Sequence, residues 1–343
     1  MEQHPLVSIV LVVYNGEKYI RHCLRAATAQ KYPNCEVIVF DNASTDRTIE
    51  IVGQEFPGVK IVKNPTNLGT WPGQEAALEH ANGEFIVSLS VDVMIDEDFV
   101  QQAVEEIQKD ARIGAIQGKL YQYNFDQLAN NSYRSGKIID TCGFKIYKSR
   151  KIGNIGHGER DFGQYNKTNE IFGVEGAVPF FRRAALEDIR IENKIADPDY
   201  FWYGDDLDIV WRMNMFGWRQ IFVPSAIAWH DRSTTKGTAE TPVLGQIKRL
   251  SSRRSIPIHK RRLDWSNVRF TIIKNDYIIN ILKDAPRILI REIATFGYWI
   301  LFEQRMFLEI GRFFKLLPKM LRRRKLVMEA ARVTSSEIHR WFI

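Results

Sequence analysis

With 343 residues, 45% of them apolar, the chain can bury a sizeable core, which excludes wholesale disorder. Its net charge of +7 is uneven, because residues 243–343 hold 22 Lys and Arg against 8 Asp and Glu, whereas residues 1–242 hold 26 against 33. We therefore expect an acidic body over residues 1–242 and a basic, mainly helical region over residues 243–343.

The first hundred residues alternate between short apolar runs and segments with helical spacing. Leu6 to Val13 is almost unbroken in its apolar character, as expected for a strand that is covered on both faces. The predicted elements are, in order, a strand over 6–13, a helix over 20–27, a strand over 36–40, a helix through 49–52 capped by Ser44 or Thr45, a strand over 59–62, a helix with Pro72 in its first turn, a strand over 85–89, and a helix from Asp96.

This alternation predicts an α/β fold, with a Rossmann-like parallel sheet covered by helices on both faces. The carboxyl ends of parallel strands share one edge of the sheet, where a nucleotide would lie. Polar side chains follow each predicted strand at that edge, namely Tyr14, Asn15, Asp41, Asn42, Asn67 and Asp92. The chain has neither G-x-G-x-x-G nor G-x-x-x-x-G-K-[ST], so neither a dehydrogenase cofactor nor a P-loop is indicated.

The next part of the chain carries a second concentration of acids. Residues 114–148 are rich in predicted strands, and residues 171–183 predict a buried strand that enters a short helix. In residues 200–212, YFWYGDDLDIVWR, three aspartates fall at or near a helix start. A strand over 220–223 then leads to Trp229-His230-Asp231.

These motifs, in this order, resemble glycosyltransferase family 2, the inverting transferases with the A-type glycosyltransferase fold. The resemblance covers about residues 5–235 and rests on VSIVLVVYN, VFDNASTD, NPTNLG, SVD, VEGAVPFFRR, DDLDIVWR and the late WH. Within the family, the chain looks most similar to bacterial rhamnosyltransferase-like members that build cell-surface polysaccharides. Residues 1–242 would then be the catalytic domain.

The resemblance implies a divalent cation, manganese or magnesium, that bridges the diphosphate of a nucleotide-sugar donor. Asp92 would bind it, and His230 is a further candidate ligand, although a lone histidine is more often structural. The family motif is commonly D-x-D, or N-x-D in this branch, whereas Ser90 holds its first position here. Serine is a poorer metal ligand than a carboxylate, so this departure puts metal dependence in question.

The same resemblance places the general base at Asp206, which would take the proton of the acceptor hydroxyl as it attacks the anomeric carbon. Attack from the face opposite the nucleotide inverts the stereochemistry. Asp205 would orient or bind the acceptor, since adjacent acids in different environments divide their roles. Alternatively, Asp205 and Asp208 merely favour a helix amino terminus.

The remaining site candidates surround the donor. Asp41 would accept hydrogen bonds from the base or ribose, and Tyr14 and Asn15 would supply the facing wall, while Asn67 and Gly69 would shape the nearby loop. The alternative for Asp41 is turn chemistry, and both readings are compatible. Two further candidates for sugar contacts are the aromatic pair Trp202 and Tyr203, which core packing would also explain, and Glu175.

In the basic region, Met306, Ile310, Phe313 and Leu317 share one helical face, joined by Phe307 and Phe314, and Pro318 is expected to end or kink the helix. A basic helix with such a face suits an anionic membrane surface. The alternative is a helix that packs on the catalytic domain with its charges toward solvent. The longest apolar run, Ile293 to Phe302, is ten residues, which is too short to span a membrane.

The three cysteines have no metal-ligand spacing and no even-numbered framework, which is typical of a reducing compartment, and the amino terminus has no signal-peptide pattern. We therefore expect a cytoplasmic protein, peripheral on the inner face of the cell membrane. Its predicted function is an inverting, metal-assisted glycosyltransferase that moves a sugar, rhamnose in the narrower interpretation, to a hydroxyl of a glycan or lipid-linked acceptor. The alternatives are a nucleotidyltransferase, a sugar-nucleotide-binding protein with little or no turnover, and a nucleic-acid-binding protein. The last is disfavoured, because the basic region carries its aromatic residues on an apolar face and the body is acidic.

Overall fold

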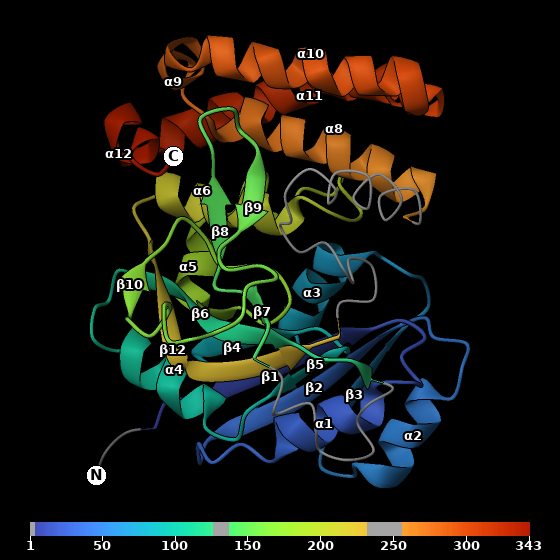
Figure 1. Ribbon diagram of the computed structural model, residues 1–343. Helices are drawn as coiled ribbons and strands as arrows, with labels where there is room; N and C mark the ends of the chain where they lie inside the picture. The colour runs from blue at the N-terminus through green and yellow to red at the C-terminus, as the bar shows by residue number, and fades with distance from the viewer. Residues whose placement is uncertain (1–3, 126–136, 232–255) are drawn as a thin grey trace.

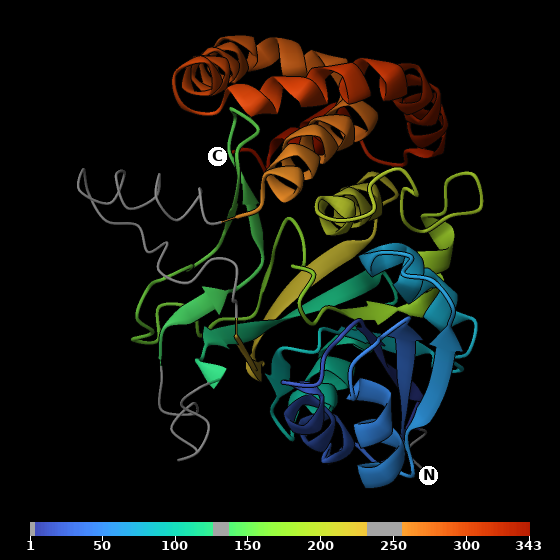
Figure 2. The same ribbon diagram turned by 90° about the vertical axis from the view of Figure 1, so that its right-hand side faces the viewer.

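The computed structural model describes residues 4–125, 137–231 and 256–343. A twisted sheet with helices on both faces forms the lower part of the molecule in Figures 1 and 2, and the helices of the C-terminal region lie together above it. This arrangement confirms the predicted α/β class with a helical C-terminal region. The predicted boundary between residues 242 and 243 falls outside the described residues.

The first half of the sheet is parallel, as predicted. β1 (Val7–Val13) pairs with β2 (Cys35–Asn42) on one side and with β4 (Phe85–Leu89) on the other, and β2 pairs with β3 (Lys60–Asn64). The connecting helices are α1 (Ile20–Thr28), α2 (Thr48–Glu55) and α3 (Thr70–Leu78). The carboxyl ends of these strands therefore share one edge of the sheet.

The second half of the sheet, beyond β4, is mixed, and it lies outside the first hundred residues whose alternation predicted parallel pairing. β11 (Phe180–Arg182) pairs antiparallel with both β4 and β6 (Ile113–Gln122). β12 (Arg219–His230) is parallel to β6 and antiparallel to β10 (Asn169–Glu170). No helix lies between β6 and β11 within the described residues, so no crossover is present there to bring β11 in parallel.

Short elements complete this half. β5 (Val93–Ile95), which the sequence did not predict, pairs with β12, and β7 (Ile139–Thr141) pairs with β6. The hairpin of β8 (Phe144–Ile146) and β9 (Ile152–Asn154) stands apart from the main sheet. The helices here are α4 (Phe99–Ile107), α5 (Arg183–Asp188) and α6 (Asp205–Met215).

Two predicted helix starts need correction. Neither Ser44 nor Thr45 caps α2, because both lie before its first turn and hydrogen-bond with Asn15; Asp46 instead accepts the Thr48 N–H at 3.0 Å. α4 begins at Phe99, not Asp96, because β5 takes up the residues immediately before Asp96.

The core has two parts, one on each face of the sheet. Ile9 and Leu11 of β1 pack with α1, α2 and α4, whereas Val10 packs on the opposite face with α3, α5 and α6. Alternation along the strand therefore supplies apolar side chains to both sides, which explains the continuous apolar runs.

The C-terminal region is a stack of helices. These are α8 (Ile258–Asn275), α9 (Ile278–Lys283), α10 (Ala285–Phe302), the short 3₁₀ helix η3 (Gln304–Phe307), α11 (Leu308–Ala330) and α12 (Ser335–His339). α8 and α11 pack against α6, and α10 is outermost (Figures 1 and 2). No described helix is long and apolar enough to cross a membrane.

α11 differs from the prediction in two respects. It continues past Pro318, whose exposed position leaves the unpaired Phe314 carbonyl open to water. Most of the predicted membrane-facing side instead packs inward: Met306 of η3 is fully buried, and Phe313 stacks on Phe270 at a centroid distance of 4.9 Å, whereas Phe314 is 63% exposed. Several basic side chains of α11 also point toward the catalytic part of the fold and not to solvent. For example, Arg323 pairs with Asp197 and Lys319 pairs with Asp199.

Candidate functional site

The donor side of the predicted site is a network of short loops after β1 and β2. The Asn15 N–H donates to Ser44 Oγ at 3.0 Å, and the Thr45 N–H donates to Asn15 Oδ1 at 2.8 Å. Asn15 has a φ of 51°, a left-handed conformation that asparagine tolerates better than most residues. Tyr14 beside it is 51% exposed, so its ring is open to a ligand.

The loop after β3 is fixed by Asn42. Its Nδ2 donates to Asn67 Oδ1 and to the Gly69 carbonyl, both at 3.0 Å, and its Oδ1 accepts the Leu68 N–H. Asp41 is buried, and its Oδ1 accepts the Ser44 N–H at 2.9 Å. The turn-forming role of Asp41 is therefore confirmed, while its predicted contact with the nucleotide stays a prediction.

Gly69 touches the loop that precedes α6. Its φ is 89°, and a Cβ placed there would lie 2.3 Å from the Phe201 carbonyl oxygen. The neighbouring Thr70 N–H donates to that same oxygen at 3.4 Å. Only glycine combines this backbone conformation with so close an approach.

Asp92 and His230 lie together at the end of β4 and of β12. The distance from His230 Nε2 to Asp92 Oδ2 is 3.5 Å, and the Asp231 N–H donates to the Asp92 carbonyl at 3.0 Å. On the other side of the ring, His230 Nδ1 is 2.9 Å from Oδ2 of Asp140, a fully buried carboxylate on β7. Burial alone would lower the pKa of His230, but the hydrogen bonds to Asp140 and Asp92 outweigh it and raise the pKa to about 10.

The chemistry of this donor set fits a divalent cation. A carboxylate and an imidazole face each other, and the second ring nitrogen is held by Asp140, the arrangement that orients metal-binding histidines. The raised pKa of His230 shows that the place favours positive charge, which a cation would supply in place of the proton. No group of three or more His, Cys, Asp or Glu side chains in residues 4–125, 137–231 and 256–343 is arranged around a metal position.

Ser90 lies two residues before Asp92 and connects this corner to the rest of the sheet edge. Its N–H donates to the Ala177 carbonyl at 2.9 Å, and its carbonyl accepts the Val93 N–H. Its backbone contacts thus join the end of β4 to the segment before β11.

The paired acids open α6, as the sequence predicts. Asp205 is 5% exposed, its Oδ1 accepts the Asp206 N–H at 3.1 Å, and its buried Oδ2 has no hydrogen-bond partner among the described residues. Burial, together with the charges of Asp205 and Glu175, raises the pKa of Asp206 to about 8. Burial also raises the pKa of Asp205, to about 6. The two carboxyls thus share one negative charge near neutral pH.

The Asp206 carboxylate lies against Gly176, where a Cβ would come within 2.9 Å of its Oδ2. Gly176 adjoins Ala177, the residue bonded to Ser90. A short chain of contacts therefore leads from the acids of α6 to the Ser90–Asp92 segment, along one edge of the sheet. Glu175 is fixed in the same segment, where its Oε2 accepts the Ala177 N–H at 3.0 Å.

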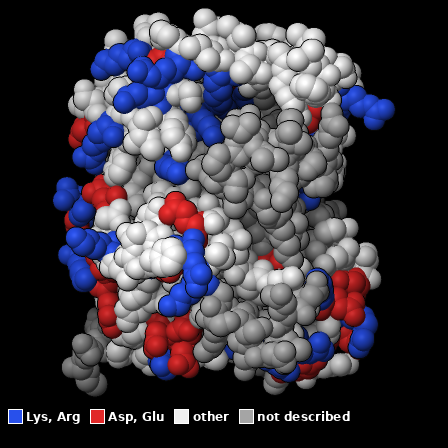
Figure 3. All heavy atoms as spheres, in the orientation of Figure 1, with Lys and Arg blue, Asp and Glu red and all other residues white. Residues whose placement is uncertain are grey.

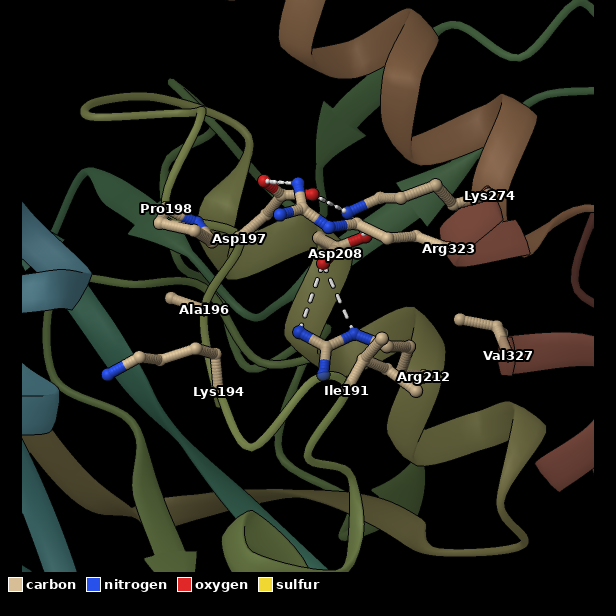
Figure 4. A pocket seen from close by; sticks show the side chains of 10 residues that line it. All are labelled: Ile191, Lys194, Ala196, Asp197, Pro198, Asp208, Arg212, Lys274, Arg323 and Val327. Carbon is tan, nitrogen blue, oxygen red and sulfur yellow. Dashed lines mark hydrogen bonds and ion pairs between the residues drawn. The ribbon is translucent and has the colours of Figure 1, made fainter. Parts of the chain in front are cut away.

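Asp208, the third acid of this helix, belongs to a buried ion network that lines a separate pocket (Figure 4). It pairs with Arg212 at 3.0 Å and with Lys274 of α8 at 3.0 Å. Lys274 also binds Asp197 at 2.6 Å, and Arg323 of α11 binds Asp197 at 2.6 Å. Burial would raise the pKa of Asp208, but Lys274 and Arg212 outweigh it and lower the pKa.

The loop before α6 is held by α8. Asn267 Nδ2 donates to the carbonyls of Tyr200, Trp202 and Tyr203 at 2.8 to 3.0 Å. Phe201 and Tyr203 have φ values of 60° and 63°, which are strained for aromatic residues. The rings of Trp202 and Tyr203 stack on each other at 5.1 Å, and Lys260 Nζ lies 3.8 Å from the Trp202 centroid.

Asp140 and Asn267 are contributors that sequence reasoning missed. Asp140 sits in a three-residue strand, and Asn267 lies more than sixty residues beyond the acids it supports. Neither belongs to a recognisable motif. The only local signal that Asn267 offers is its polar side chain at a buried helix position, where a hydrogen-bonding role is expected.

Comparison with protein families decides what this arrangement belongs to. A model described as glycosyl transferase family 2 matches residues 8–190, more than half of the chain. The chain belongs to glycosyl transferase family 2.

Among curated relatives, poly-beta-1,6-N-acetyl-D-glucosamine synthase of Staphylococcus epidermidis is 24% identical to this family member over 230 residues, covering 65% of the chain and 49% of the synthase. The chain thus spans about half the length of the curated synthases it matches first.

Solved structures share the fold. The 1–349 fragment of S. aureus TarS has a TM-score of 0.55 at 18% identity, over 98% of this chain and 89% of the fragment. The mannosyltransferase PcManGT from Pyrobaculum calidifontis, solved with GDP-Man and Mn2+, has a TM-score of 0.52 at 17% identity, over 96% and 86% of the two chains. These matches cover nearly the whole chain, so the likeness in fold includes the C-terminal helices.

Proposed function

We propose that this family 2 protein is an inverting glycosyltransferase that moves a sugar from a nucleotide-diphosphate donor to a hydroxyl of a glycan or lipid-linked acceptor in cell-surface polysaccharide synthesis. The observation that carries the proposal is the acid pair of Asp205, which is buried, and Asp206, which is half-buried. One of these carboxyls has a pKa raised to about 8, and a chain of contacts connects it to the corner that holds Asp92 and His230. The synthase relative supports the polysaccharide context.

In this mechanism, Asp206 in its ionised form accepts the acceptor proton while the oxygen attacks the anomeric carbon. A raised pKa makes the carboxylate a stronger base, which suits proton abstraction near neutral pH. Asp205 keeps the pair from being fully ionised and orients the acceptor. Attack opposite the leaving nucleotide gives a product with inverted stereochemistry.

On the donor side, Tyr14 and Asn15 form one wall for the nucleotide, and the loop of Asn67 and Gly69 forms the other, with Asp41 accepting from base or ribose. Asp92 and His230 would hold a divalent cation, manganese or magnesium, which neutralises the charge of the departing diphosphate when bound. The complex of the mannosyltransferase with GDP-Man and Mn2+ supports both donor and cation. Ser90 contributes its backbone contacts at this corner and no strong ligand. The narrower assignment of rhamnose as the transferred sugar stays a prediction.

The test is donor turnover across UDP-, GDP- and dTDP-sugars, with and without Mn2+, for the wild type, Asp206→Asn and Asp92→Ala. We expect Mn2+-stimulated turnover that Asp206→Asn lowers by a factor of about 10² to 10⁴ while nucleotide binding persists. Asp92→Ala should instead weaken donor binding. Glu97→Gln, a surface acid paired with Lys31, is the matched control.

Two results would remove these roles. Full activity in Asp206→Asn would eliminate it as the base. Nucleotide binding by the wild type without turnover of any donor would favour the alternative of a sugar-nucleotide-binding protein.

A further inference from the structure

The outermost helices of the C-terminal region expose an unusual amount of apolar surface. Of the seventeen large apolar side chains that are exposed among the described residues, twelve lie between residues 278 and 321. Nine of these belong to α9 and α10, each at least 49% exposed: Ile278, Ile279, Leu282, Leu289, Ile290, Ile293, Ile300, Leu301 and Phe302. We call these nine the outer apolar face.

α10 has two apolar sides, and only one of them is needed for packing. Phe296 and Trp299 point inward, where Trp299 is fully buried against Trp265 at a centroid distance of 4.8 Å. Leu289, Ile290 and Ile293 lie on the opposite side and are 60 to 69% exposed. A surface helix of a globular protein ordinarily turns a polar side to water, so the outer apolar face calls for a partner.

Within residues 278–325 the exposed charges have one sign. Lys283, Arg287, Arg305 and Lys315 are exposed. All four acids between residues 278 and 325 are withdrawn: Asp284, Glu303 and Glu309 are at most 6% exposed, and Glu292 is paired with Arg269 at 2.6 Å. In Figure 3 the upper edge, where α10 lies, is mainly white with blue atoms at its left.

We propose that the outer apolar face, with its surrounding lysines and arginines, docks this protein on an anionic lipid bilayer. α10 lies in the plane of the interface, with its aliphatic side chains among the acyl chains and its bases at the headgroups. This goes beyond the proposed function and does not depend on it.

Two observations favour lipid over a protein partner. If a second copy of the chain bound to the same face, exposed Lys and Arg side chains would face each other. No exposed acid between residues 278 and 325 would be there to pair with them. The face is also made of isoleucine and leucine with a single phenylalanine, whereas the anchors of protein interfaces are enriched in Trp, Tyr and Arg.

The test uses the full chain and vesicles of phosphatidylcholine, with or without phosphatidylglycerol, in a co-sedimentation assay. We expect binding to the anionic vesicles that weakens as salt is raised. The double variant Leu289→Glu, Ile293→Glu should bind more than about tenfold more weakly, because two side chains no longer enter the apolar layer. Lys283→Gln with Arg287→Gln should lose about fivefold for each charge, on anionic vesicles only.

The matched control is Phe162→Glu, which places the same charge at an apolar side chain that is 82% exposed elsewhere on the molecule. It should bind vesicles as the wild type does. Thermal unfolding of each variant shows whether the fold is retained, since all the substituted side chains are exposed.

The proposal is overturned if the wild type ignores anionic vesicles, or if Phe162→Glu loses binding as much as the double variant. It is also overturned if light scattering shows a dimer that the double variant dissociates while vesicles are not bound, because a second copy would then be the partner. None of these measurements uses a sugar donor, so failure here leaves the transferase proposal standing.

Discussion

At the scale of single residues, the acid pair is the most informative feature of the site. Asp206 lies between Asp205 and the segment of Glu175 and Gly176, so its carboxyl meets burial and two neighbouring negative charges together. Asp208, two residues further along the helix, has cationic partners and a lowered pKa instead. Among three acids within four residues, the pKa values of Asp205 and Asp206 are thus raised and that of Asp208 is lowered, and the difference comes from their environments.

The pH dependence of turnover follows from this pair. Because Asp206 must be ionised to take a proton and its pKa is raised to about 8, kcat/KM should increase with pH, reach half of its maximum near pH 8, and level off about one pH unit above. Asp205→Asn removes the adjacent negative charge, so Asp206 should ionise at lower pH and the rise should move toward acid. A pH–rate series for both proteins measures this, and an unmoved profile in Asp205→Asn would show that the pair does not govern the rate.

At the scale of elements, α8 supports the catalytic loop. Its Asn267 amide ties three carbonyls of the loop before α6, and its Lys274 and Asn275 bind Asp208 in the first turn of that helix. A strained loop persists only where its surroundings hold it in place. α8, which lies far along the chain from the predicted nucleotide loops, is therefore a positioning element for the predicted base.

Asn267→Ala should lower turnover about tenfold or more, because the loop loses the amide group that donates to three of its carbonyls, and the acids that follow the loop then shift. Hydrogen exchange of residues 200–206 should rise at the same time. Asn280 of α9 is equally buried, and its amide donates to the Ser335 carbonyl of α12. Asn280→Ala therefore serves as the control. Equal losses of turnover in the two variants would reduce Asn267 to a general stabilising residue.

The fold class and the order of the first elements could be predicted from sequence because strand and helix periods are local properties. Longer-range features could not. The antiparallel entry of β11 depends on how the chain returns, and the pairing of His230 with Asp140 joins two strands ninety residues apart. For the helices, periodicity identified an apolar side of α11 but could not say whether lipid or protein covers it; Phe313 proved to be interior, and Ile293 exposed.

At the scale of the whole molecule, the uneven charge of the sequence has a structural use. Arg323 of the basic region binds Asp197, Asp199 and Glu192 of the acidic body, and Lys274 bridges Asp197 and Asp208. These contacts are largely buried, so the two regions are joined by groups that cannot be separated without exposing unpaired charges.

Removing one partner of this network should therefore destabilise the whole chain. Arg323→Met should lower the free energy of unfolding by about 1.5 to 3 kcal/mol, because the buried Asp197 loses a charge-assisted hydrogen bond and is left to share Lys274 with Asp208. Lys325→Met, two residues along at a 78% exposed side chain, should change it by less than about 0.5 kcal/mol. Denaturant unfolding measures both, and similar values for the two variants would contradict the role of the network.

The close approach of Gly69 to the Phe201 carbonyl couples two parts of the predicted site. The two loops lie so near each other that any side chain at position 69 would collide with that carbonyl. Under the proposed function, a nucleotide bound against the loop of Gly69 would restrict the segment that leads to Asp205, and would hold the predicted base in place before the acceptor binds. We expect the nucleotide to bind first, in a compulsory order of addition.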